Sequence, residues 1–109
     1  GGMTDNPRFI LYGSRYDALL PQRPLVKREE IVTICGKCCE SGDILIKDIK
    51  MPKINTGDLI AVLSTGAYNY SMSSNYNRLP RPAVVMVRDG VPRVIVKRET
   101  YDDIIRNDL

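Results

Sequence analysis

Three cysteines within a five-residue stretch are the most reactive side chains of the sequence. Cys35, Cys38 and Cys39 could serve as proton donors, metal ligands or a redox pair. The chain contains no histidine, so it has no Cys-His nucleophile and lacks the commonest neutral zinc ligand. Structural zinc needs four ligands, and Cys35-x-x-Cys38 has no second pair of this kind. We therefore expect no metal site, and free thiols in a protein of the reducing cytoplasm.

The elements that position these groups belong to a chain of ordinary globular composition, with 109 residues, 43% apolar and 27% charged. This length predicts one domain. The net charge of +3 comes from scattered basic residues, without the dense basic stripe of a nucleic-acid-binding protein. No apolar run approaches the roughly 20 residues of a membrane span, and the chain does not open with a signal-peptide pattern. We therefore expect neither nucleic acid nor membrane as a partner.

Short runs rich in valine, isoleucine and leucine alternate with turn residues and predict strands. These runs are Ile31 to Ile34, Ile44 to Ile46, Leu59 to Leu63, Ala83 to Val87 and Val94 to Val96. Asp89-Gly90 separates the last two and predicts a hairpin turn, because both positions tolerate positive φ. Pro92 predicts an edge position, since proline cannot donate to the ladder.

Helix is predicted only near the end of the chain. There Thr100 could act as the N-cap, with Asp103 three residues later in place of the glutamate of a capping box. Many short strands and few helices indicate a small β-barrel or sandwich with a short C-terminal helix. The fold class is therefore mainly β.

Three segments, in order over nearly the whole chain, resemble the diaminopimelate decarboxylases. They are Gly1-Gly2-Met3-Thr4-Asp5-Asn6-Pro7-Arg8 continuing to Leu11-Tyr12; Cys38-Cys39-Glu40-Ser41-Gly42-Asp43; and Gly66-Ala67-Tyr68 followed by Met72, Ser74, Tyr76-Asn77 and Arg81-Pro82. Phe9 stands where the family usually has proline, and we expect only a local effect on the backbone.

The resemblance implies that residues 1–109 are the carboxy-terminal domain of a two-domain enzyme dependent on pyridoxal 5'-phosphate. This domain would be a Greek-key-like barrel similar to that of alanine racemase, and residues 1–24 would lead in from a (β/α)8 barrel that carries the cofactor lysine. None of the lysines in this chain matches that lysine. The resemblance further implies a homodimer, with each active site between one subunit's barrel and its partner's β-domain.

The resemblance also assigns roles in recognition of an amino-acid substrate with two carboxylates and two ammonium groups. Arg8 and Tyr12 would contact a substrate carboxylate, and a guanidinium suits this because it can donate two parallel hydrogen bonds. Their spacing places them together on a helical turn but about 13 Å apart on a strand; the sequence leaves both open. Glu40 would bind the far ammonium group.

Cys39 aligns with the family cysteine that returns a proton to the α-carbon, and a thiol suits this role because neighbours readily tune its pKa from about 8.5. Tyr68 aligns with the tyrosine that contacts both cofactor and substrate. Cys35 and Cys38 are interpreted as packing residues, and Ser41 and Asp43 as supports of the motif.

Two other functions stay open at this stage. One is a related decarboxylase of ornithine, arginine or carboxynorspermidine. The other is a non-catalytic β-barrel that binds or assembles without a reaction.

Overall fold

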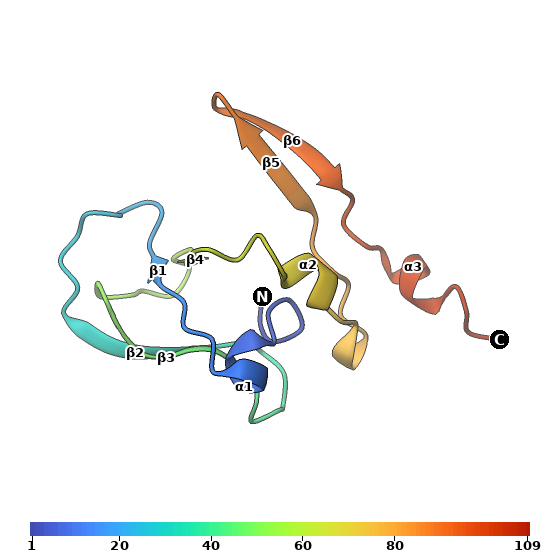
Figure 1. The fold of residues 1–109 in the computed structure, drawn as a ribbon, viewed down its shortest axis with the longest axis horizontal. Helices are drawn as coiled ribbons and strands as arrows, with labels where there is room; N and C mark the ends of the chain where they lie inside the picture. The colour runs from blue at the N-terminus through green and yellow to red at the C-terminus, as the bar shows by residue number, and fades with distance from the viewer.

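The structure, a computed structural model, describes residues 1–109 as short strands joined by loops and very short helices (Figure 1). The strands are β1 (Ala18–Leu19), β2 (Glu30–Cys35), β3 (Ile44–Met51), β4 (Ala61–Val62), β5 (Val84–Arg88) and β6 (Val91–Val96). The helices are α1 (Arg8–Tyr12), α2 (Asn69–Met72), the 3-10 helix η1 (Tyr76–Arg78) and α3 (Tyr101–Ile105). Each of the five predicted strands is present, and the mainly β fold is confirmed. None of the helices has the length and hydropathy needed to cross a membrane.

The strands form three separate antiparallel sheets of two strands each: β1 with β4, β2 with β3, and β5 with β6. Of the predicted barrel or sandwich, a barrel is therefore not detected within these residues. Turn signals such as Asp89-Gly90 specify hairpins, but closure also requires pairing between hairpins, and here each strand has only one partner. The short strand β1 was not predicted, because two residues that pair with the distant β4 leave no local pattern.

The hairpin of β5 and β6 extends away from the rest of the chain (Figure 1). Its turn is formed by Asp89 and Gly90, with φ of 51° and 75°, the consecutive positive values of a type I′ turn. Pro92 lies opposite Val87. The predicted edge position of Pro92 is confirmed, because both strands of a two-stranded sheet are edges.

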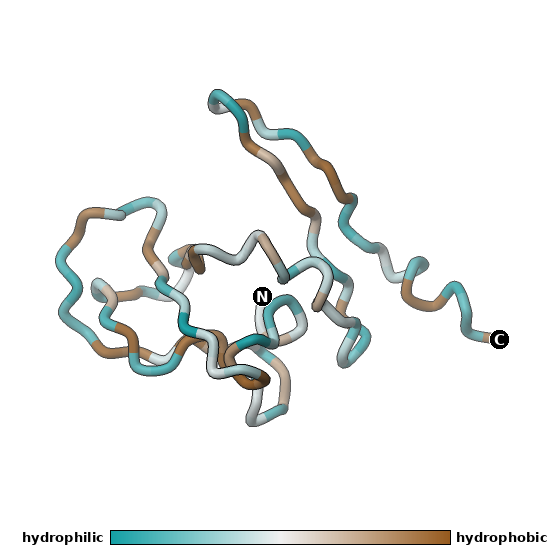
Figure 2. Tube along the Cα trace, viewed as in Figure 1, coloured by the Kyte–Doolittle hydropathy of each residue, from teal (hydrophilic) through white to brown (hydrophobic).

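A small core holds the first two sheets together. It consists of Ala18, Leu20, Leu45, Ile46 and Met51. Apolar stretches also line both strands of the β5–β6 hairpin, far from this core (Figure 2). Their side chains are open to solvent: Val87, for example, is 65% exposed. The apolar surface of the hairpin is thus uncovered within residues 1–109.

The predicted helix near the end of the chain is present, but the prediction that helix occurs only there was wrong, because α1, α2 and η1 are helical as well. These segments are too short to show an apolar period in the sequence. Thr100 caps α3 as expected, because its side chain accepts a hydrogen bond from the Asp103 N–H and the Asp103 carboxylate accepts from the Thr100 N–H. Near the other end, Arg8 to Tyr12 are helical and pack on β3. The question left open by the sequence is answered in favour of the helix, so Arg8 and Tyr12 lie on one face.

Candidate functional site

The guanidinium of Arg8 lies between two tyrosine rings. Its central carbon is 5.3 Å from the ring centre of Tyr12 and 4.4 Å from that of Tyr68, within the range of cation–π contacts. An Arg8 N–H also points at the Met72 sulfur, 3.9 Å away. Arg8 forms none of the ion pairs of the chain. Its donors are therefore oriented by aromatic and thioether contacts but not occupied by a carboxylate, as an anion-binding arginine requires.

Hydrogen bonds donated by backbone N–H groups bring the three motif segments together. The Met3 N–H donates to one oxygen of Asp43 at 2.6 Å, and the Cys38 N–H donates to the other at 2.8 Å. The Ser74 N–H donates to the Thr4 carbonyl at 2.8 Å. Residues that are up to 70 positions apart in the sequence thus contact the segment before α1, which contains Met3 and Thr4.

Cys39 and Glu40 lie on the loop between β2 and β3, and both are exposed. The Glu40 carboxylate accepts a hydrogen bond from the Gly42 N–H at 3.0 Å, so it is folded back over its own loop. Gly42 in turn lies against the Ile10 side chain. On a helix, Ile10 points about 200° away from Arg8. The structure thus gathers Arg8, Tyr12 and Tyr68 on one side of α1 and places the Cys39–Glu40 loop on the other.

Two titratable groups behind this loop are perturbed. Burial alone would raise the pKa of Asp43, but hydrogen bonds from Met3 and Cys38 outweigh it and lower the pKa below its ordinary value. Burial and the charge of Asp43 both raise the pKa of the Cys38 thiol. Asp43 is therefore ionised and Cys38 is a neutral thiol at neutral pH. All three cysteines are free.

Tyr68 could contact a bound cofactor. The residue is 54% exposed and its hydroxyl takes part in no hydrogen bond of the chain, so the phenol is free to donate to a phosphate. The lysines are on the surface, for example Lys37 and Lys50. No group of three or more Cys, Asp or Glu side chains gathers in a way that could hold a metal ion. The residues present suit the rim of a cofactor pocket rather than its attachment point.

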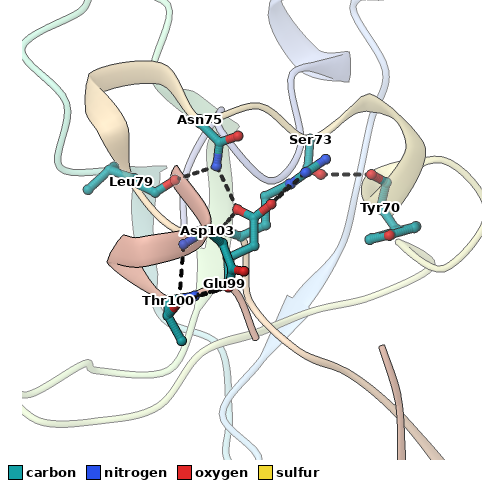
Figure 3. A network of polar contacts seen from close by, with 8 residues as sticks. Tyr70, Ser73, Asn75, Leu79, Glu99, Thr100 and Asp103 are labelled. Carbon is teal, nitrogen blue, oxygen red and sulfur yellow. Dashed lines mark hydrogen bonds and ion pairs between the residues drawn. The ribbon is translucent and has the colours of Figure 1, made fainter. Parts of the chain in front are cut away.

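A second polar network was missed from the sequence. Glu99 accepts hydrogen bonds from the Asn75 side chain at 2.6 Å and from the Arg81 backbone and guanidinium at 2.8 and 2.7 Å. Figure 3 shows Glu99 at the centre, with Asn75 also reaching the Leu79 carbonyl. Arg81-Pro82 belongs to one of the motifs named above, but nothing in the sequence indicated that Arg81 is hydrogen-bonded to Glu99. Met72 was likewise part of a motif without a predicted contact.

The family of the chain follows from its similarity to known proteins. Residues 1–66, more than half of the chain, fit the family described as pyridoxal-dependent decarboxylase, C-terminal sheet domain. The chain belongs to this family. The relatives described next are diaminopimelate decarboxylases.

One such relative, the diaminopimelate decarboxylase of Bacillus subtilis strain 168, is 55% identical over 109 residues. That of Synechocystis sp. is 54% identical over 108 residues. The alignments cover 100% and 99% of this chain but only 25% and 23% of those proteins. The crystal structure of the enzyme from M. jannaschii in complex with L-lysine superposes with a TM-score of 0.89 at 34% identity, covering 100% of this chain and 25% of that one. The chain thus spans about a quarter of the length of the relatives it matches.

Proposed function

We propose that this domain works within a longer protein that decarboxylates meso-2,6-diaminopimelate to L-lysine and CO2 with the help of pyridoxal 5'-phosphate. The observation that carries the proposal is the unpaired Arg8 guanidinium held between Tyr12 and Tyr68. The similarity to diaminopimelate decarboxylases over the whole chain supports it. Three free thiols agree with a reducing cytoplasm.

The substrate needs recognition at both ends. It carries two carboxylates and two ammonium groups, and only the D-centre loses CO2. Arg8 would bind the far carboxylate through two parallel N–H groups, with Tyr12 beside it. Glu40 would bind the far ammonium once its carboxylate turns out from the Gly42 N–H. Ornithine and arginine lack this second α-amino acid centre, so they would gain nothing from the pair.

The remaining roles concern proton transfer and the cofactor. Pyridoxal phosphate supplies an electron sink when it is bound. Tyr68 would border it, donating its hydroxyl to the phosphate while its ring keeps Arg8 in place. The Cys39 thiol would return a proton from Sγ to the α-carbon after CO2 leaves. A rim of this kind also limits the access of water to the pocket.

The longer protein would act as a homodimer. Because Arg8, Tyr12 and Tyr68 lie on one side of α1 and the Cys39–Glu40 loop on the other, we place the two groups in two different active sites of the dimer. Each site would then combine a (β/α)8 barrel with residues of two β-domains, whereas the resemblance alone implied only the partner's β-domain. Strands of the longer protein that pair with the free edges of this chain would complete a Greek-key-like barrel.

The full-length protein with pyridoxal phosphate tests the proposal. It should release CO2 from meso-diaminopimelate and form L-lysine, whereas residues 1–109 alone should be inactive. Preference for ornithine, arginine or carboxynorspermidine would contradict the proposed substrate. Lysine formation by the isolated chain with added cofactor would contradict the proposal that the reaction also needs the (β/α)8 barrel.

The Arg8→Ala variant tests whether the unpaired Arg8 guanidinium binds the substrate. Its KM for diaminopimelate should rise about tenfold to a hundredfold, because a hydrogen-bonded charge contributes about 1.5–3 kcal/mol. Arg88→Ala is the matched control, since Arg88 is 90% exposed on the hairpin and meets only Asp89. An unchanged KM in Arg8→Ala, with Arg88→Ala as reference, would favour one of the rival decarboxylases.

A further inference from the structure

Asp43 is the one charged residue that is buried, with 3% of its surface exposed. Both carboxylate oxygens are used: one accepts the Met3 N–H at 2.6 Å and the other the Cys38 N–H at 2.8 Å. These are short, charge-assisted hydrogen bonds of the stronger kind. The backbone of Asp43 adds a further link, since its carbonyl accepts the Gly36 N–H at 2.9 Å.

Two glycines make room for this carboxylate. A Cβ on Gly2 would lie 2.6 Å from one oxygen of Asp43, and a Cβ on Gly36 would collide with both oxygens. Any other residue at these positions would therefore push the carboxylate or the backbone aside. Gly2, Gly36 and Asp43 thus form one close contact between the segment that leads into α1 and the loop that follows β2.

The contact of Asp43 with Gly2 and Gly36 lies close in sequence to two groups of proposed site residues. Cys38 immediately precedes Cys39 and Glu40, and Met3 lies in the segment that leads to Arg8. Cys39 and Glu40 are themselves exposed and have no anchoring contact to another element. The position of their loop therefore depends on the residues at its base, and the strongest contact there is the pair of bonds to Asp43.

We propose that Asp43 is a positioning residue of the decarboxylase site, whose carboxylate fixes the Cys39–Glu40 loop against the Gly2–Met3 backbone. This inference rests on the proposed function. The role requires a carboxylate, because both oxygens must accept. The amide introduced by Asp43→Asn would offer one oxygen and turn an NH2 group toward the second N–H, leaving two donors face to face.

The test is a double-mutant cycle in the full-length holoenzyme. Asp43→Asn is measured alone and in a Cys39→Ala background, together with Asp102→Asn, which alters a carboxylate exposed in the first turn of α3. Asp43→Asn should lower kcat about tenfold or more, because small misplacements of a reacting group have effects of this size. In the Cys39→Ala background the further loss should be about threefold or less, since the group being positioned is already gone. Asp102→Asn should keep full kcat.

Equal losses in both backgrounds would show a merely structural role and overturn the proposal, as would an unchanged kcat. If Asp43→Asn does not give folded holoenzyme, Asp43→Ser takes its place, since its hydroxyl keeps one acceptor in less space. A second readout does not depend on turnover: the rate of Cys39 alkylation should rise at least threefold in the Asp43 variant, and an unchanged rate would contradict the inference. Absence of lysine formation by the unmodified enzyme would instead refute the proposed function, and the alkylation rates would still decide the role of Asp43.

Discussion

At the scale of single residues, the unusual feature is a cation without an anion. Most arginines of this chain that are held in place are held by carboxylates, as Arg28 is by Asp17 at 2.8 Å and Arg81 by Glu99. Arg8 is held by two rings and a sulfur atom. Such contacts restrict the direction of the guanidinium and leave its N–H groups unpaired. This is the arrangement expected of an arginine that meets its anion in a ligand.

A pair of substitutions separates the ring of Tyr68 from its hydroxyl. Tyr68→Phe keeps the stacking on Arg8, and Tyr68→Leu removes it. Since a cation–π contact contributes about 0.5–2 kcal/mol, the KM for diaminopimelate should be about threefold to thirtyfold higher in Tyr68→Leu than in Tyr68→Phe. Steady-state kinetics of the full-length enzyme measures this difference. Equal KM values in the two variants would mean that the ring does not orient Arg8.

The Cys38 thiol should react slowly with alkylating agents, although it lies in a cluster of three cysteines. Burial, and after it the charge of Asp43, raises the pKa of Cys38, so less thiolate is present at neutral pH than in the unfolded chain. The rate of its alkylation should rise with pH around a midpoint above that found in urea. Peptide mass spectrometry of iodoacetamide labelling measures both midpoints. A folded-state midpoint at or below the unfolded one would contradict the assignment.

At the scale of elements, one carboxylate closes the base of the β5–β6 hairpin. Arg81 precedes β5 and Glu99 follows β6, and the two are joined by side-chain hydrogen bonds and by the Glu99 N–H to the Arg81 carbonyl at 3.1 Å. Asn75 ties the same carboxylate to the loop before the hairpin (Figure 3). The hairpin has no sheet beside it, so this network sets its direction.

Replacing Glu99 should loosen the hairpin in a pH-dependent way. Hydrogen bonds from Arg81, first from its side chain, lower the pKa of Glu99 from 4.5 to about 2. The unfolded chain takes up the proton near pH 4.5, so the stabilisation is complete above that pH and is lost as the pH falls toward 2. At pH 7, Glu99→Gln should lower the free energy of unfolding by about 1–2 kcal/mol, and the gap to the unmodified protein should narrow below pH 4.5.

Thermal unfolding of the full-length protein between pH 2.5 and 7 measures this gap. Glu29→Gln is the matched control, because Glu29 pairs with Lys27 on the open surface, where the two side chains are 63% and 84% exposed. Such pairs contribute about 0–1 kcal/mol. A gap for Glu99→Gln that stays constant over this pH range would contradict the pKa assignment.

Local signals explain which elements could be predicted from the sequence. The Asp89-Gly90 turn, the Thr100 cap and the β-branched runs act over a few residues, and all are confirmed. The pairing of β1 with β4 and the packing of Ile10 against Gly42 join distant parts of the chain and left no pattern. The motifs marked where site residues lie. Their division between the two sides of α1 depends on the helix, which spacing alone could not decide.

At the scale of the molecule, the chain exposes more surface than its mass predicts. A compact protein of 12.3 kDa would expose about 6,100 Å², and this chain exposes 8217 Å². Its radius of gyration is 15.3 Å, against about 13 Å for a compact domain of this length. The excess of about 2,000 Å² is in the range of an obligate interface. The β5–β6 hairpin, which is clear of the small core (Figure 2), carries six apolar residues that are 48–67% exposed: Val85, Met86, Val87, Val91, Val94 and Ile95.

The isolated chain should therefore depend on the rest of the longer protein for a stable fold. With only five apolar residues buried in its core, residues 1–109 should unfold at a temperature more than about 10 °C below that of the full-length protein, because a loss of a few kcal/mol shifts a domain of this size by that much. Its transition should also be broad, and a dye specific for apolar surface should bind it strongly. Adding a separately made (β/α)8 domain should sharpen the transition and suppress the dye signal, since the uncovered strands would then be buried. A sharp transition of the isolated chain at the full-length temperature, without dye binding, would mean that these 109 residues need no covering partner.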